Sequence, residues 1–293
     1  MSRDEVSYGV DSMAKPLRRV AMRVPQAILT ADADRWHYAK PIDAVALADQ
    51  YQNFADLVAA SGAEIVWMPE ADDDLADSVF TYDPSFVVPG GAIVLRPGKP
   101  LRSGEAALHR AFYERNDIAI LGEIEAPGTI EGGDCFWLDA TTLAVGRGFR
   151  TNSEGIDQLR AILEPRGVAV KVFDLPYYKG PEACLHLMSV VSSLDDDLAL
   201  VYAPLVPTAL YELMVEMGYT LIHAPDDEFE ASLGLNLNVL ATAPRNVIAV
   251  EGFPVTIEAM RSAGCEVTTF DADELCIPCE GGPTCLTRPL LRH

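Results

Sequence analysis

Apolar and polar positions follow two different periods along the chain. In the stretch 41–62, apolar residues from Val45 to Val58 recur at helical spacing, and Gly62 provides a stop. Further amphipathic stretches begin near residues 102, 153, 207 and 254. Each of these five predicted helices is followed by a compact apolar run that favours a strand: 64–69, 118–121, 168–173, 219–223 and 265–270.

Before each of the last four helices stands a pair of short apolar runs separated by a turn, which is typical of a β-hairpin. These pairs are 86–88 with 92–95, 135–138 with 143–145, 187–191 with 198–202, and 236–241 with 247–250. The fifth hairpin is split between the two ends of the chain, with one half at 17–24 and the other at 285–291. Pairing of these halves would bring the termini together.

The order hairpin, helix, strand therefore recurs five times, about every 50 residues. Joining of the terminal halves would close the units into a ring without an exposed edge between first and last. We predict an α/β fold of five ββαβ units, forming a single domain over residues 1–293 with a flexible N-terminal segment at 1–16. The alternative, a doubly wound open sheet, needs no hairpin in every period.

Composition narrows the class of partner. The chain has 293 residues, 49% of them hydrophobic, with 44 acidic against 22 basic residues and a net charge of −22. The electrostatic field of this negative charge repels the phosphate backbones of nucleic acids and anionic lipids, and it attracts a small cation. The chain has no apolar run long enough for a bilayer span and no signal-peptide core at its start. We therefore expect a cytoplasmic protein with no nucleic-acid or membrane partner, and we leave a homo-oligomer open.

Five polar residues stand at the entrances of the five hairpins, separated by 51, 52, 50 and 49 residues: Asp83, Asp134, His186, Asn236 and Cys285. Equivalent positions in a ring of similar units lie at the same end of its axis, so these side chains should converge on one central pocket. Each residue taken singly could instead be an ordinary turn residue. Together they predict a site with carboxylates, an imidazole and a thiol.

The cysteines are few for this length, and in a reducing compartment they become buried thiols, metal ligands or a nucleophile. We interpret Cys135, Cys184 and Cys265 as buried thiols. Cys285 follows the turn sequence 280–284, whose glycines and proline would leave its thiol accessible.

Zinc is an alternative use of three of these thiols. Cys276 and Cys279, two residues apart in a C-x-x-C spacing, could combine with Cys285. A structural zinc site needs four ligands, and the sequence supplies no second pair or nearby histidine. We therefore expect no metal at this position.

The histidine and the acids allow general acid and base chemistry. His186 precedes an apolar run and would alone be a satisfied interior residue, but it stands at the position equivalent to Cys285. In Glu131-Gly132-Gly133-Asp134, the glycines let the backbone turn sharply, so that one carboxylate could orient an imidazole and the other bind a cation.

At this point the motifs resemble those of the guanidine-modifying family, which contains arginine deiminases, amidinotransferases and dimethylarginine dimethylaminohydrolases. The resemblance runs from about residue 18 to residue 290. It rests on motifs in a fixed order: 77–80, 96–98, 125–128, 131–134, 150–152, 186–187 and Cys285. It is strongest for the dimethylaminohydrolases, and it implies a pseudo-fivefold α/β propeller, in agreement with the five units.

The resemblance also implies roles for individual residues. Cys285 would attack the guanidinium carbon and form a covalent S-alkylthiouronium intermediate, with His186 as general acid and then base and Glu131 as its partner. The substrate contacts carried over are Asp83 and Asp134 to the guanidinium, Asp77 to the α-amino group, and Arg96 and Arg150 to the α-carboxylate. No cofactor is implied.

Two positions depart from the family pattern. Tyr82 stands where dimethylarginine dimethylaminohydrolases usually have an acid next to the guanidinium, which weakens the methylarginine assignment. Met188 stands where arginine deiminases and amidinotransferases usually have an aspartate, which favours the dimethylaminohydrolase branch.

The resemblance thus predicts an enzyme that hydrolyses a guanidinium C–N bond of arginine or an Nω-methylated arginine, giving citrulline and an amine or ammonia. An amidinotransferase and a non-catalytic arginine-binding module are the alternatives.

Overall fold

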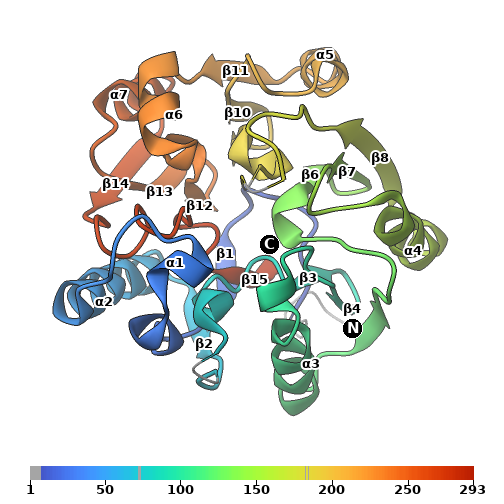
Figure 1. Cartoon of the computed structure of the whole chain (residues 1–293). Helices are drawn as coiled ribbons and strands as arrows, with labels where there is room; N and C mark the ends of the chain where they lie inside the picture. Colours follow the sequence, from blue (N-terminus) through green and yellow to red (C-terminus); the bar gives the residue numbers. More distant parts are fainter. Residues whose placement is uncertain (1–7, 72–73, 182, 184) are drawn as a thin grey trace.

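A computed structural model describes residues 8–71, 74–181, 183 and 185–293. Its strands form five three-stranded sheets, and in each sheet an antiparallel pair continues into a third, parallel strand. Figure 1 shows the five units arranged around a common centre, with α2, α3, α4, α5 and α7 on the outside. The fold is therefore the predicted α/β propeller of five units.

Four units are continuous in sequence and share the order hairpin, helix, strand. They consist of β3 (Ser85–Val88), β4 (Gly91–Val94), α3 (Glu105–Arg115) and β5 (Ile120–Glu123); β6 (Cys135–Asp139), β7 (Thr142–Arg147), α4 (Ser153–Leu163) and β8 (Ala169–Asp174); β9 (Val191–Asp195), β10 (Leu198–Val201), α5 (Thr208–Glu216) and β11 (Thr220–His223); and β12 (Leu240–Ala243), β13 (Asn246–Val250), α7 (Pro254–Ser262) and β14 (Glu266–Phe270).

The fifth unit joins the two ends of the chain. It combines β15 (Arg288–Arg292), β1 (Leu17–Met22), α2 (Ala44–Ala60) and β2 (Glu64–Trp67). Val20 of β1 lies opposite Pro289 in the antiparallel pairing with β15 and opposite Ile65 in the parallel pairing with β2. The predicted split hairpin is confirmed, and it closes the ring.

Two of the long helices, α2 and α4, begin at a side chain that caps their first turn. The side chain of Asp43 caps α2 by accepting hydrogen bonds from the backbone N–H groups of Val45 and Ala46, and Asn152 caps α4 in the same way. The apolar face of α2, which includes Phe54 and Val58, is buried against the sheets. No helix among the described residues is long and apolar enough to cross a membrane.

Short helical turns, rather than strands, lead into several hairpins. The predicted strands at 187–191 and 236–241 are wrong in their first halves, because η7 (Leu187–Ser189) and η8 (Leu235–Leu237) occupy them. Leu187 and Leu237 are fully buried within these turns, so an apolar run of this length does not distinguish a turn from a strand. Two more turns, η3 (Ala76–Val79) and η5 (Gly132–Asp134), precede β3 and β6.

The remaining elements lie in the connections between these helices and strands. Two short helices were not predicted: α1 (Ala33–Trp36) lies within the fifth unit, and α6 (Asp226–Ser232) lies between two units. Three further turns lie within units: η2 (Ala27–Thr30), η4 (Pro100–Arg102) and η6 (Glu164–Arg166).

Residues 8–16 differ from the flexible segment that the sequence predicts. Gly9 pairs with Leu291 of β15, and its N–H donates to the carbonyl of Leu290 at 2.7 Å. The side chains of Val10 and Ala14 are buried. This segment is therefore held against the closing strand, and residues 1–7 lie outside the described part of the chain.

Candidate active site

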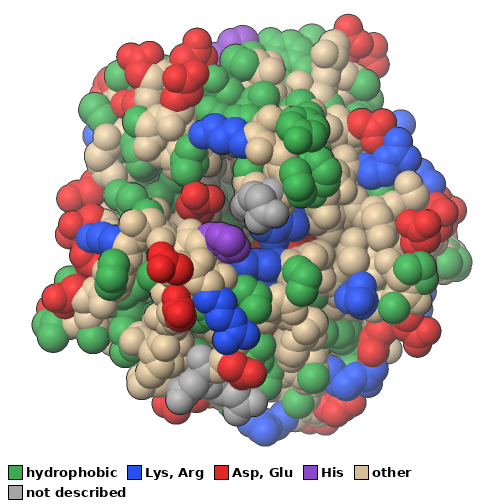
Figure 2. Space-filling model, viewed as in Figure 1, with side chains coloured by type: hydrophobic (Ala, Val, Ile, Leu, Met, Phe, Trp, Pro, Cys, Tyr) green, Lys and Arg blue, Asp and Glu red, His purple; other side chains and the backbone are tan. Residues whose placement is uncertain are grey.

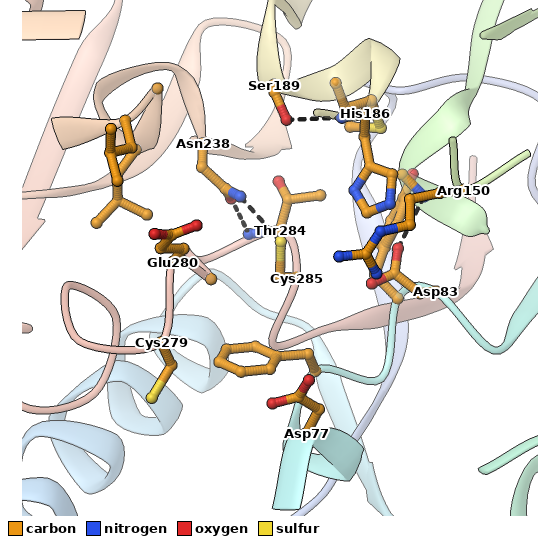
Figure 3. A pocket seen from close by; sticks show the side chains of 18 of the residues that line it. Asp77, Asp83, Arg150, His186, Ser189, Asn238, Cys279, Glu280, Thr284 and Cys285 are labelled. Atoms are coloured by element: carbon orange, nitrogen blue, oxygen red, sulfur yellow. Dashed lines mark hydrogen bonds between the residues drawn. The ribbon is translucent and has the colours of Figure 1, made fainter. Parts of the chain in front are cut away.

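A cavity of about 120 Å³ opens at one end of the propeller axis. Its lining includes one residue from each unit: Asp83, Gly133, His186, Asn238 and Cys285. Figure 2 shows a hollow near the centre of this face with basic, acidic and histidine side chains gathered around it, and Figure 3 shows His186, Asn238 and Cys285 side by side within it. Turns from all five units therefore meet at this cavity, but of the five residues predicted to converge there only Asp83, His186 and Cys285 line it.

The thiol of Cys285 is positioned by the turn before it. Side chains on Gly281 and Gly282 would collide with the Phe80 ring and with Asn238, so only glycines allow this close approach. Asn238 donates a hydrogen bond from Nδ2 to Sγ of Cys285 at 2.9 Å and accepts one from the N–H of Thr284 at 3.1 Å. Asn238 thus fixes both the sulfur and the backbone that carries it.

Burial favours the protonated form of the Cys285 thiol near neutral pH. Burial raises the pKa of Cys285 to about 11, and the negative charge of Asp83 acts in the same direction. The hydrogen bond from Asn238 and the charge of His186 oppose this rise without outweighing it. A cation next to the sulfur would favour the thiolate.

The imidazole of His186 is paired with a buried carboxylate. Its Nε2 lies 2.5 Å from Oε2 of Glu131, which is fully buried at the entrance of η5. Burial by itself raises the pKa of Glu131, but the hydrogen bond and charge of His186 and the charges of Arg150 and Arg102 outweigh it and hold the pKa well below its usual range. Glu131 is therefore ionised and orients the imidazole.

Backbone groups hold Glu131 in place, and a glycine makes room for its partner. The N–H of Gly98 donates to Oε1 of Glu131 at 2.8 Å, and Nη1 of Arg150 lies 3.5 Å from the same oxygen. A β-carbon on Gly133 would come within 2.6 Å of Nδ1 of His186. The predicted role of the two glycines, a sharp turn that brings functional groups together, agrees with this geometry.

Asp83 is already bound to a cation of the protein. Its Oδ2 accepts a hydrogen bond from Nη1 of Arg102 at 2.6 Å, and its Oδ1 accepts one from the N–H of Gly133 at 2.9 Å. Arg102 also pairs with Glu105 at 2.8 Å, and burial raises the pKa of Glu105 to about 7 despite this pairing. The sequence did not single out Arg102, because its position in a turn before a helix carries no distinguishing motif.

A second ion pair lies at another side of the pocket. Asp77 accepts hydrogen bonds from the hydroxyl of Tyr38 at 2.7 Å and from Nζ of Lys99 at 2.6 Å. Lys99 also lies over the ring of Trp36, 4.8 Å from its centroid. Lys99 directly follows the motif at 96–98, and that adjacency was the one sequence signal that could have found it.

Glu280 completes the acidic groups of the pocket. It lines the cavity beside Cys285 (Figure 3), in a left-handed backbone conformation with φ of 56°. Unlike Asp77 and Asp83, it has no hydrogen bond or ion pair with another described residue. Its charge is therefore available to a cation that enters the pocket.

Four sequence-derived candidates lie outside the lining of this cavity, and one of them, Glu131, reaches it only through its hydrogen bond to His186. Asp134 is fully buried, and its Oδ1 accepts a hydrogen bond from the N–H of Leu187, so it holds the turn that carries His186 and does not face the pocket. Asn236 instead donates to Thr256, and Asn238, two residues later, takes the expected place. Arg96 donates to the carbonyl of Gly128 at 3.2 Å.

Two further candidates do line the cavity. Arg150 does so beside Glu131. Tyr82 is buried, with its ring stacked against the guanidinium of Arg288 at 3.8 Å, and burial raises the pKa of its phenol. The phenol of Tyr82 is therefore neutral, and it supplies no negative charge to the pocket.

The other described cysteines are not placed as a metal site. Cys135, Cys265 and Cys276 are buried thiols, whereas Cys279 is partly exposed at the pocket wall. Cys184 lies outside the described residues. Among the described residues, the group with metal-ligand chemistry is Asp83, Glu131 and His186, whose ligand atoms lie within 4.8 Å of one another. Protein donors already occupy these carboxylates, so the arrangement is that of an acid and base pair.

Comparisons with known proteins agree with this geometry. The family model described as arginine deiminase matches residues 67–212. The N(G),N(G)-dimethylarginine dimethylaminohydrolase of Pseudomonas aeruginosa is 28% identical over 270 residues, covering 92% of this chain and 98% of that protein. The Streptomyces coelicolor protein of the same name is 32% identical over 190 residues, covering 65% of this chain and 70% of the relative.

The fold is shared with a solved structure. The P. aeruginosa dimethylarginine dimethylaminohydrolase in complex with citrulline superimposes with a TM-score of 0.74 at 23% identity, covering 93% of this chain and 99% of that chain.

Proposed function

We propose, because the chain belongs to the guanidine-modifying family of dimethylarginine dimethylaminohydrolases and arginine deiminases, that it hydrolyses a guanidinium C–N bond of arginine or an Nω-methylated arginine to citrulline. The observation that carries this proposal is that Cys285 and His186 line one pocket, with the buried carboxylate of Glu131 hydrogen-bonded to the imidazole. A nucleophile and an oriented imidazole are the two groups that covalent hydrolysis of an amidine needs.

The first half of the reaction forms a bond to sulfur. The guanidinium cation enters beside Cys285 and favours its thiolate. The proton of the thiol passes to the imidazole of His186, and Sγ attacks the central carbon of the guanidinium. The C–N bond to the leaving group then breaks as His186 gives its proton to the departing amine. The product is an S-alkylthiouronium on Cys285, and Glu131 stabilises the charged imidazole before it donates.

The second half consumes water. His186, now neutral, takes a proton from a water molecule that attacks the same carbon, and the C–S bond breaks to release citrulline and the Cys285 sulfur. Two moderate steps thus replace direct attack of water on a resonance-stabilised cation.

The pocket offers charges for both ends of the substrate. Asp83 and Glu280 lie on the lining near Cys285 and supply negative charge for the guanidinium, while Arg150 can bind the α-carboxylate and Asp77 the α-amino group. We no longer assign Asp134 a substrate contact, because it is buried beneath the turn of His186. Arg96, outside the lining, could act only through the loop that it holds.

Tyr82 bears on the choice between arginine and its methylated forms. Its neutral phenol replaces an acid and packs on Arg288, so we expect a weak preference for dimethylarginine over arginine. A hydrogen bond to a charged group contributes about 1.5–3 kcal/mol, and the variant Tyr82→Glu should therefore shift the ratio of kcat/KM values toward methylated arginine by roughly tenfold to a hundredfold.

The decisive experiment measures citrulline release from arginine, Nω-methylarginine and dimethylarginine, and identifies the released ammonia or amine. We expect turnover of at least one of these, with a mass adduct on Cys285 in quenched samples. Cys285→Ser should lose about a thousandfold or more in kcat while retaining the fold, and Cys279→Ser, at the pocket wall, should keep most of the activity.

Three outcomes would contradict the proposal. Turnover near the wild-type rate in Cys285→Ser would remove the covalent route. Amidino transfer to an added amine without citrulline would favour an amidinotransferase, and arginine binding without turnover or adduct would indicate a binding module.

A further inference from the structure

A second cavity lies behind the candidate active site, inside the propeller. Its volume is about 20 Å³, which is room for one particle of the size of a water molecule. Four residues line both cavities and form the partition between them: Tyr82, Met188, Ser192 and Thr284. All the lining residues of the inner cavity except Met13 are buried.

Two arginines of the closing strand β15 line this inner cavity. The side chains of Arg288 and Arg292 are 1% and 5% exposed. Arg288 donates to the carbonyl of Tyr82, and Arg292 donates to the carbonyls of Lys15 and Ala241 at 2.6 and 2.8 Å. All these acceptors are neutral, and neither guanidinium has a carboxylate of the described residues within 4.0 Å.

The cavity also has hydrogen-bond donors that no protein group uses. Nε of Arg288 and Nε1 of Trp137 are buried without a hydrogen-bond partner among the described residues, and both side chains line the cavity. Trp137 is 2% exposed, and it stacks on Phe86, which lies beneath the guanidinium of Arg288. Buried donors of this kind ordinarily have acceptors.

The acceptor for these buried donors could be a water molecule or an anion, and the positive charge of the two arginines favours an anion. A buried cation is costly unless an opposite charge compensates it, and here two guanidinium groups share one enclosed space. Burial and the positive charge of Arg288 together lower the pKa of Arg292 to about 10, although the electrostatic effect of Tyr82 opposes this. A water molecule would accept hydrogen bonds but leave both charges uncompensated, and the volume is too small for sulfate or phosphate.

We propose that the inner cavity binds one small monovalent inorganic anion of the size of chloride, held by Arg288, Arg292 and Trp137. Because both arginines belong to β15, the anion would stabilise the strand that closes the ring. This proposal is independent of the hydrolase activity, since none of the three side chains is assigned a role in the reaction.

The test compares thermal unfolding of the full chain in potassium chloride and in potassium gluconate at equal ionic strength. Chloride at ten times its dissociation constant should raise Tm by about 3 °C relative to gluconate, and above that concentration Tm should keep rising with the logarithm of the chloride concentration. Trp137→Phe removes the Nε1 donor but keeps an aromatic ring on Phe86, so it should lose at least half of this chloride-dependent shift. The matched control Trp67→Phe, at a tryptophan that is 49% exposed, should keep all of it.

A second measurement does not depend on the variants. Crystals grown with sodium bromide should show an anomalous scattering peak between the guanidinium groups of Arg288 and Arg292. Equal Tm values in chloride and gluconate, or a cavity that contains no bromide and only an ordered water, would overturn the proposal, as would an equal chloride response in Trp137→Phe and the control.

Discussion

Ionised side chains in the candidate pocket come mostly in pairs, and this pairing sets the state of the nucleophile. Asp83 is paired with Arg102, Asp77 with Lys99, and Glu131 with His186. A thiol among buried acids stays protonated until a cation arrives. Reactivity of Cys285 would thus depend on the charge that a guanidinium substrate itself brings, and free thiolate would be scarce without substrate.

The charge of Asp83 should be visible in the titration of the thiol. Asp83→Asn removes a negative charge that raises the pKa of Cys285, and it leaves Arg102 less compensated, so both effects lower this pKa. We expect the pH midpoint for alkylation of Cys285 by iodoacetamide to move from about 11 downward by about one unit. Mass spectrometry of the peptide that contains Cys285 gives the rate at each pH.

The control for this titration is Asp56→Asn, at an exposed residue of α2. Its alkylation profile should match that of the unchanged protein. A midpoint in Asp83→Asn that is unaltered or higher would show that Asp83 does not act on the sulfur.

At the scale of elements, the turns before the hairpins matter more than the strands. Four of the five turns place a side chain on the lining of the pocket, and the turn at 132–134 places Gly133 there. Two glycine pairs, 132–133 and 281–282, allow neighbouring turns to approach closely. The positions of the pocket side chains therefore depend on these glycines, whose lack of a β-carbon leaves room for the neighbouring turn. The glycines are part of the site although they supply no reactive group.

This dependence can be tested at Gly133. In Gly133→Ala the new methyl group would lie 2.6 Å from Nδ1 and 2.7 Å from Cγ of His186, so the imidazole must move. A displacement of about 1 Å can cost about a hundredfold in rate, and we expect a fall of that size in kcat with a small change in Tm.

Gly148→Ala is the matched control, because its nearest neighbour is the flexible end of Leu175 at 3.2 Å. It should keep nearly all of the activity. Full activity in Gly133→Ala would mean that the position of His186 is not constrained by this turn.

The whole molecule is closed by its two ends, which gives the last strand a role in global stability. β15 pairs with β1 on one side, and on its other side Gly9 forms a parallel bridge with Leu291 of β15. We propose that the ring is a single domain, so that weakening its closure should weaken every unit. Independent subdomains would instead unfold separately.

Leu290→Ala tests this cooperativity. Leu290 is 1% exposed on β15, and truncation of a buried leucine costs about 2–5 kcal/mol of the free energy of unfolding. Guanidinium chloride unfolding followed by circular dichroism and by tryptophan fluorescence should give coincident transitions, both shifted to lower denaturant. Leu29→Ala, at a residue that is 36% exposed, should shift them much less. Two separated transitions would contradict the single domain.

The fivefold repeat, and with it the fold, could be predicted from the order of apolar and polar residues alone. Helices and strands bury one face, so their apolar residues recur at helical or alternating spacing in the sequence. The split fifth hairpin follows because the chain shows four complete units and two unpaired terminal segments. The spacing of about 50 residues also located Asp83, His186 and Cys285 at one end of the axis. The predicted repeat and the predicted positions of these residues do not change when the ends of a helix or strand are misplaced by a few residues.

The direction in which each turn residue points became known from the folded structure and could not be predicted from the repeat. A period fixes the unit to which a residue belongs but not the orientation of its side chain within a short helical turn. Asn236 therefore binds Thr256 while Asn238 reaches the thiol, and Asp134 holds a backbone N–H beneath the pocket. The pairing of Arg102 and Lys99 with pocket acids, like the two arginines of the inner cavity, joins side chains from separate segments, and no local pattern records such contacts.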